Sequence, residues 1–171
     1  MTLQHYILEI EDNKRHSKEY IENNFKKIGE GSEGDVYSDG NYAYKIVQDD
    51  LVASPEKINN NIINHKNVVK IYDSWYDLND YYIIIKMELL EELPLNKVDE
   101  DEYEHVQELL WNSEDDINIV KRIYNKIKDP EIKKMVEAII NVFGVIDYVD
   151  VGFHNLMYNP KTKEYKQIDI F

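Results

Sequence analysis

The sequence predicts an α+β protein in which a β-rich first half precedes a helical second half. Up to about residue 88, short segments rich in β-branched and aromatic residues alternate with turn-forming residues, which is typical of antiparallel strands. From about Asp101 to Gly144, apolar residues recur with a period near 3.6, which is typical of amphipathic helices. A helix start at Ser54-Pro55-Glu56 interrupts the strand-like segments.

The elements of the first half can be placed from local signals. In order, we expect a helix at 17–24, strands at 25–28, 36–37 and 42–47, a helix from 55 to about 64, and strands at 68–72 and 81–87. Asp39-Gly40 is typical of a tight turn, so the second and third strands should form a hairpin. After the helical region, 156–158 and 165–168 should pair across a turn at Asn159-Pro160.

The composition limits the classes of partner and compartment. With 171 residues and 43% apolar content, the chain is long enough for one domain or for two small lobes around a cleft. The net charge of −14 argues against nucleic acid or an anionic membrane as a partner and favours a basic protein. The absence of cysteine excludes disulfides and thiolate chemistry, and no signal-peptide or membrane-spanning pattern is present. We therefore expect a soluble, cytoplasmic protein.

A glycine-rich segment, Gly29-Glu30-Gly31-Ser32-Glu33-Gly34, joins the first two strands. Glycines let backbone N–H groups approach a phosphate closely, because no Cβ intervenes. The G-x-G-x-x-G pattern alone fits a flexible turn equally well. Its context is more informative: a dinucleotide-binding loop leads from a strand into a helix, whereas this segment leads into a second strand and Val36.

Polar residues then follow at intervals that suit phosphoryl transfer. Lys45 lies on the third strand, and Glu56 lies in the first turn of the inserted helix. Asp150 and Asn155 are five positions apart, and Asp169 follows after a hairpin. Each residue alone is unremarkable, since a strand lysine is more often an exposed charge and an Asp-x4-Asn pair arises by chance in acidic chains. Their order along the chain is the informative feature.

In this order, the segments resemble the protein-kinase-like superfamily from about Phe25 to Phe171. The matching segments are the glycine run with Val36 (G-x-G-x-x-G-x-V), Ala43-Tyr44-Lys45 (A-x-K), His65-Lys66-Asn67-Val68-Val69 (H-P-N-I-V), Asp150 to Asn155 (the catalytic loop) and Gln167 to Phe171 (the strand with D-F-G). The resemblance implies one kinase-like domain with a bilobal fold: a five-stranded antiparallel N-lobe with one helix at about 1–88, and a reduced helical C-lobe at 89–171. The C-lobe would lack the activation segment and later helices, as in minimal kinases of phages and bacterial effectors.

The resemblance also implies ATP and Mg²⁺ as cofactors and a role for each site residue. Asp150 would accept or orient the proton of the substrate hydroxyl, and Lys45, aligned by Glu56, would bind the α- and β-phosphates. Magnesium would be bound by Asn155 and Asp169. The remaining implied ATP contacts are Gly29, Gly31, Ser32 and Gly34 over the phosphates, Val36, Ala43 and Met157 around adenine, Met87 as gatekeeper, and the backbones of Glu88 and Leu90 as adenine-binding groups.

The chain departs from the family pattern at the catalytic loop and at its end. Gly152 stands where a lysine normally contacts the γ-phosphate, and His154 is a candidate substitute, although a histidine beside a turn is more often a surface residue. Tyr148-Val149 stands where His-Arg would be. Ile170-Phe171 replaces Phe-Gly.

The favoured interpretation is an ATP- and Mg²⁺-dependent phosphotransferase that phosphorylates serine or threonine in a protein. The alternative is a pseudokinase-like module that binds a partner protein, with ATP structural or absent. The departures favour the module, whereas retention of all five polar positions favours the enzyme. A small-molecule kinase is a third interpretation, although little chain remains for a substrate pocket. A basic partner is expected at the acidic run Asp99–Glu102.

Overall fold

The computed structural model describes residues 15–31, 34–48, 53–77, 81–146, 149 and 151–168. It is an α+β structure with a five-stranded antiparallel sheet, a two-stranded sheet and several helices, which confirms the predicted class. The chain divides into two compact units. The first combines the described residues up to Asn60 with Tyr72–Lys86, and the second combines Asn61–Ile71 with the described residues from Met87 onward.

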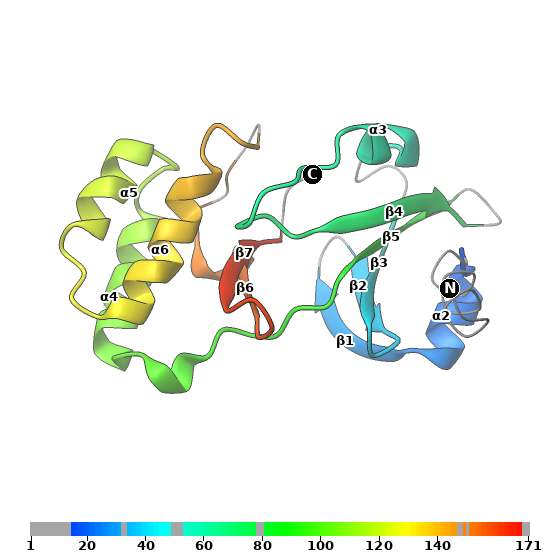
Figure 1. Cartoon of the computed structure of the whole chain (residues 1–171), viewed down its shortest axis with the longest axis horizontal. Coiled ribbons are helices and arrows are strands. Elements are labelled where there is room, and N and C mark those ends of the chain that lie inside the picture. Colours follow the sequence, from blue (N-terminus) through cyan, green and yellow to red (C-terminus); the bar gives the residue numbers. More distant parts are fainter. Residues whose placement is uncertain are drawn as a thin grey trace, which may run out of the picture. The chain divides into compact units, whose positions relative to one another are not determined.

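The first unit contains helix α2 and most of the larger sheet (Figure 1). The elements up to the end of this sheet are α2 (Lys18–Asn24), β1 (Lys26–Gly31), β2 (Gly34–Ser38), β3 (Tyr42–Gln48), α3 (Pro55–Asn60), β4 (Ile71–Tyr76) and β5 (Tyr82–Glu88). The strand order is β1-β2-β3-β5-β4. The connection through α3 therefore joins β3 to a strand that is not its neighbour, and β5 pairs with both.

The β2–β3 hairpin forms as the Asp-Gly turn predicts. The Asp39 carboxylate accepts hydrogen bonds from the backbone N–H groups of Asn41 and Tyr42, both at 2.8 Å. Gly40 has a φ of +94°, a left-handed conformation that favours glycine. The turn thereby fixes the register of β2 against β3.

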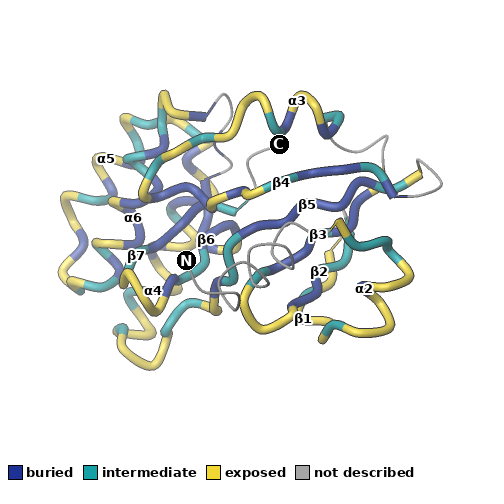
Figure 2. Tube along the Cα trace, turned by 45° about the vertical axis from the view of Figure 1, so that its right-hand side comes forward, coloured by how far each residue is buried: buried dark blue, intermediate teal, exposed yellow. Residues whose placement is uncertain are grey.

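One face of the sheet in the first unit packs on α2. The buried cluster on this face consists of Ile21 from α2 and Tyr37, Tyr44, Ile46, Trp75 and Ile84 from the strands. Because successive side chains of a strand point to opposite faces, the intervening residues of β2 and β3 lie on the other face. Both β3 and β5 are buried along most of their length (Figure 2).

Helix α3 is shorter than predicted and ends at Asn60 rather than near Asn64. The side chain of Asn59 donates to the carbonyl oxygen of Ser74 at 2.9 Å and accepts from the Ser74 N–H at 2.8 Å. This contact ties the last turn of α3 to β4. Asparagine has low helix propensity, and Asn61, which follows directly, does not extend the helix.

Strand β4 begins at Ile71 rather than at the predicted residue 68. Val68 instead forms an isolated parallel bridge with Gln167, and the Val69 N–H donates to the Gln167 carbonyl oxygen at 2.9 Å. Val68 and Val69, which were expected to begin β4, therefore pair with Gln167 in the second unit.

The second unit consists mainly of three α-helices and a hairpin (Figure 1). Its elements are η1 (Leu95–Lys97), α4 (Glu100–Trp111), α5 (Ile117–Tyr124), α6 (Pro130–Val142), η2 (Phe153–Asn155), β6 (Leu156–Asn159) and β7 (Glu164–Gln167). Each α-helix follows an aspartate, Asp99, Asp116 or Asp129, whose carboxylate accepts hydrogen bonds from first-turn N–H groups. Among the described residues, no helix combines the length and apolar character needed to cross a bilayer.

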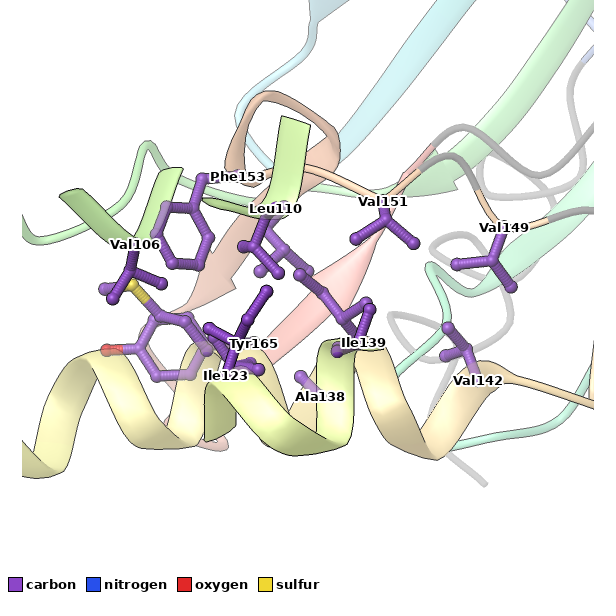
Figure 3. Close-up of a cluster of buried hydrophobic side chains, with 14 of the residues drawn as sticks. Val106, Leu110, Ile123, Ala138, Ile139, Val142, Val149, Val151, Phe153 and Tyr165 are labelled. Carbon is purple, nitrogen blue, oxygen red and sulfur yellow. The ribbon is translucent and has the colours of Figure 1, made fainter. Parts of the chain in front are cut away.

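The core of the second unit collects the apolar residues that recur with the helical period (Figure 3). Leu110 of α4, Ile123 of α5 and Ile139 of α6 point into one cluster. Phe153 of η2 and Tyr165 of β7 complete it, so the segment after residue 150 and the hairpin are packed on the helices.

Candidate functional site

Predicted nucleotide-contacting residues lie directly opposite one another on neighbouring strands of the first unit. Gly29 of β1 pairs with Val36 of β2, and Val36 pairs with Lys45 of β3. Directly opposed residues of antiparallel strands share a face of the sheet. Ala43 shares this face as well, because it precedes Lys45 by two residues. The structure thus brings these four residues to the face that is not covered by α2.

Gly34 is the glycine of the run that the fold itself requires. Its φ is +155°, and an added Cβ would lie 2.0 Å from the carbonyl oxygen of Ile46 in β3. An added Cβ at Gly29 or Gly31 would meet its neighbours at 3.5 Å or more, which is ordinary contact. The close approach at Gly34 therefore holds the start of β2 against the backbone of β3.

Glu56 is exposed in the first turn of α3. Among the residues that the structure describes, none forms a hydrogen bond or an ion pair with its carboxylate, so the predicted pair with Lys45 is not formed here. Glu56 instead borders an open groove of about 560 Å³ that Arg15, Asn59 and Asp77 also line. Its predicted role in aligning the lysine stays a prediction.

In the second unit, Glu88 is the centre of a buried polar network. Its Oε1 accepts from the Lys70 N–H at 2.8 Å and lies 2.9 Å from the Nζ of Lys166, and its Oε2 accepts from the Nδ2 of Asn159 at 3.0 Å. The side chains of Lys166 and Glu88 are only 8% and 11% exposed. A buried ion pair requires such additional hydrogen bonds to offset its desolvation. The Glu88 N–H donates to the Lys70 carbonyl oxygen and is not available to adenine.

The segment from Met87 to Glu91 is fixed on both sides of Leu90. Met87 and Leu90 are buried. Beyond Leu90, the N–H groups of Glu91 and Tyr158 each donate to the carbonyl oxygen of the other at 2.8 Å. No described residue accepts a hydrogen bond from the N–H of Leu90, one of the two residues whose backbones are predicted to contact adenine.

Asn155 is buried without a hydrogen-bond partner for its side-chain nitrogen. It is 7% exposed, and its Nδ2 has no acceptor among the described residues. Its backbone is fixed, because its carbonyl oxygen accepts from the Ile168 N–H at 3.0 Å. Leaving such a group unpaired costs about 1–3 kcal/mol, so stability does not explain an asparagine here. Met157 follows in β6, half-buried and opposite Lys166 of β7.

The two predicted carboxylates, Asp150 and Asp169, lie outside the described residues, as does Ser32 of the glycine run. Within the described ranges, no group of three or more His, Asp or Glu side chains could bind a metal ion. Asn155 offers an amide oxygen, a hard ligand that suits Mg²⁺. Magnesium is usually bound by one or two carboxylates together with substrate phosphates. Binding of this ion by Asn155 and Asp169 therefore stays a prediction.

Gly152 lies beneath the imidazole of His154. An added Cβ would lie 2.4 Å from the His154 Nδ1, so a larger residue at 152 would displace the ring. His154 is exposed, and its ring centroid lies 6.2 Å from that of Trp111. The proposed substitution of His154 for the missing lysine stays a prediction.

Several residues that fix this region belong to no motif. Lys166 and Asn159 fix Glu88, and Asp115, in a left-handed conformation with φ of 56°, accepts from the Val151 N–H at 2.9 Å. A lysine beside apolar residues in a short strand could have indicated a buried ion pair. Nothing in the sequence marks Asp115.

No model of a known protein family matches the chain, and a comparison with curated proteins also found no match. The functional assignment therefore depends on the chemistry and placement of the residues themselves.

Proposed function

We propose that the chain is an ATP- and Mg²⁺-dependent phosphotransferase whose acceptor is a serine or threonine hydroxyl of a protein. The observation that carries the proposal is the register in which Gly29, Val36 and Lys45 lie opposite one another on one sheet face. This register puts Lys45 opposite Val36, two residues after Gly34, whose backbone lies close to β3. A cation next to closely approachable backbone N–H groups suits a triphosphate.

The residues of the first unit and the Met87–Glu91 segment would bind the nucleotide. Lys45 would neutralise charge on the α- and β-phosphates, and Val36 and Ala43 would contact the adenine ring. Leu90 would donate its N–H to adenine, and the network around Glu88 would hold it in place. Each of these contacts orients the nucleotide before transfer, and positioning is the main requirement of this reaction.

The residues around the η2 segment would carry out the transfer. The acceptor oxygen would bond to the γ-phosphorus while the bond to the bridging oxygen of ADP breaks, and the hydroxyl proton would pass to Asp150. Magnesium bound with ATP neutralises phosphate charge, and Asn155 and Asp169 would hold it. The Nδ2 of Asn155 is buried and has no acceptor among the described residues, and an oxygen of the bound triphosphate would supply one, which supports a role for Asn155 at the nucleotide.

Thermal unfolding tests nucleotide binding separately from turnover. ATP and Mg²⁺ together should raise the melting temperature of the wild type, because a ligand that binds only the folded state stabilises it. Lys45→Met should remove the increase, whereas Lys26→Met, which alters an exposed lysine of β1, should retain it. The same increase in both variants would contradict the proposed phosphate site.

A partner-binding module is the second candidate, and two observations favour it. The Glu56 carboxylate has no described partner, and Gly152 replaces a lysine and lies beneath His154. Such a module would respond to ATP and Mg²⁺ weakly or not at all, and would transfer no phosphate to any acceptor. Phosphate transfer by the wild type that is lost in Asp150→Ala would exclude the partner-binding module.

A further inference from the structure

An open groove of about 940 Å³ runs along α4 in the second unit. One wall is a continuous face of this helix, and the other includes Val151, Gly152 and His154. The helix residues that line the groove follow one another at helical spacing: Glu100, Tyr103, Glu104, Gln107, Glu108 and Trp111. The core side of α4 is formed by Val106 and Leu110, so most of the groove face is not required for packing.

Trp111 exposes a large aromatic surface at one end of this face. It is 76% exposed, and its ring lies near that of His154 on the opposite wall. Leu95, 47% exposed, lines the same groove. Exposed apolar side chains gathered around a groove indicate contact with a partner. An exposed indole can also bind the cation of a lysine or an arginine over its face.

The charged residues of the groove indicate that this partner carries positive charge. Glu100, Glu104 and Glu108 are spaced by four, and like charges at this spacing destabilise a helix. None of them forms an ion pair with a described residue, and no described lysine or arginine lines the groove. Glu108 also lies towards the C-terminal end of α4, where the helix dipole disfavours a negative charge. A cationic ligand would relieve this repulsion.

The neighbouring acidic run, where the sequence suggested a basic partner, is partly structural. Asp99 accepts from the Glu102 N–H at 2.9 Å and caps α4. Glu102 in turn accepts from the N–H groups of Lys128 and Asp129, both at 2.8 Å. The Asp129 carboxylate accepts from the Asp99 N–H at 2.9 Å. The carboxylates of Glu102 and Asp129 therefore hold the start of α4 against the start of α6, so the binding surface lies further along α4.

We propose that the groove binds a lysine- or arginine-bearing peptide segment of the acceptor protein. One cation would lie over Trp111 and another between Glu104 and Glu108. The inference rests on the proposed function for one step: Asp150, the residue expected to orient the acceptor hydroxyl, directly precedes Val151 of the groove wall in the chain. Peptide binding at the groove therefore selects acceptors whose serine or threonine is flanked by basic residues.

Peptide binding can be measured without turnover. The probe is a short labelled peptide with one serine between arginines, and the reference peptide replaces each arginine with glutamine. Trp111 supplies an internal signal, because the other tryptophan, Trp75, is buried in the first unit. We expect the basic peptide to bind more tightly, to shift the Trp111 emission, and to bind more weakly as salt rises.

Matched charge variants locate the site. The double variant Glu104→Gln/Glu108→Gln should weaken binding by about 5–20-fold, since each exposed charge pair contributes a factor of up to about five. Glu137→Gln, which alters an exposed carboxylate of α6, should leave the affinity unchanged. Glu104→Lys should bind a peptide in which glutamate replaces arginine better than the wild type does.

The outcomes separate this inference from the proposed function. Unchanged affinity in the double variant, or equal binding of the two peptides, overturns the groove assignment. Basic peptide that binds as expected but receives no phosphate leaves the groove assignment intact and contradicts the enzyme. Phosphate transfer without preference for basic peptides supports the enzyme and contradicts the groove assignment. If two copies of the chain associate through the groove and the basic peptide does not displace this contact, the groove is an interface between copies. That result also overturns the inference.

Discussion

Replacing Gly34 with alanine tests how the glycine turn is built. The added Cβ would lie 2.0 Å from the carbonyl oxygen and 3.0 Å from the carbonyl carbon of Ile46, and neither backbone atom can rotate away. The φ of +155° adds conformational strain. Overpacking costs about 1–3 kcal/mol and an unfavourable positive φ about 1–2 kcal/mol, so we expect the free energy of unfolding to fall by about 2–5 kcal/mol. For a chain of this size, the melting temperature should fall by about 5–20 °C.

Two other glycines provide controls for this measurement. Gly40 has a positive φ of +94° but no atom within 4 Å of an added Cβ, so Gly40→Ala should show the strain alone, about 1 kcal/mol. Gly31→Ala, whose Cβ would meet its nearest atom at 3.8 Å, should be close to neutral. Urea and thermal denaturation followed by circular dichroism would rank the three. If Gly34→Ala were as mild as Gly31→Ala, the close approach of β2 to β3 would be refuted.

The remaining predictions concern the second unit. Asn155→Leu removes a buried amide nitrogen that has no acceptor, so the free energy of unfolding should stay unchanged or rise by about 1 kcal/mol. The stabilisation by ATP with Mg²⁺ should be lost. A large fall in the free energy of unfolding, measured in urea, would contradict this. Lys166→Met leaves the Glu88 carboxylate buried without its ionic partner and should lower the unfolding free energy by about 3 kcal/mol, most of which Glu88→Met in the same chain should recover. Burial opposes ionisation of Asp129, but hydrogen bonds from three backbone N–H groups outweigh it and lower its pKa from the ordinary value of an aspartate. Its contribution to stability is therefore complete above its unfolded pKa and is lost as pH falls through the folded pKa, and Asp129→Asn should flatten stability against pH in that acid range.

The secondary structure could be predicted because its signals are local. The Asp39 turn, the helix start at Pro55 and the aspartates that precede α4 to α6 each act within a few residues. The errors arise from contacts between distant segments. Helix α3 ends early where Asn59 binds Ser74, and β4 starts late because Val69 binds Gln167.

The candidate site also has one part that local signals predict and one part that they do not. The shared face of Gly29, Val36 and Lys45 follows from strand alternation and one hairpin turn, which the sequence reveals. The network of Glu88 and Lys166 depends on burial and on a pairing of residues far apart in the chain, which no local pattern encodes. The same applies to the groove along α4, because its second wall comes from a segment about forty residues away from Trp111.

Transfer of the γ-phosphate of ATP tests the central claim most directly. The full chain is incubated with Mg²⁺, γ-labelled ATP and the arginine-flanked serine peptide, in parallel with Asp150→Ala and Lys45→Met. We expect label on the serine with the wild type and a loss of nearly all label with both variants, each of which should remain folded. No label with the folded wild type, or equal label with Asp150→Ala, would contradict the assignment of a phosphotransferase.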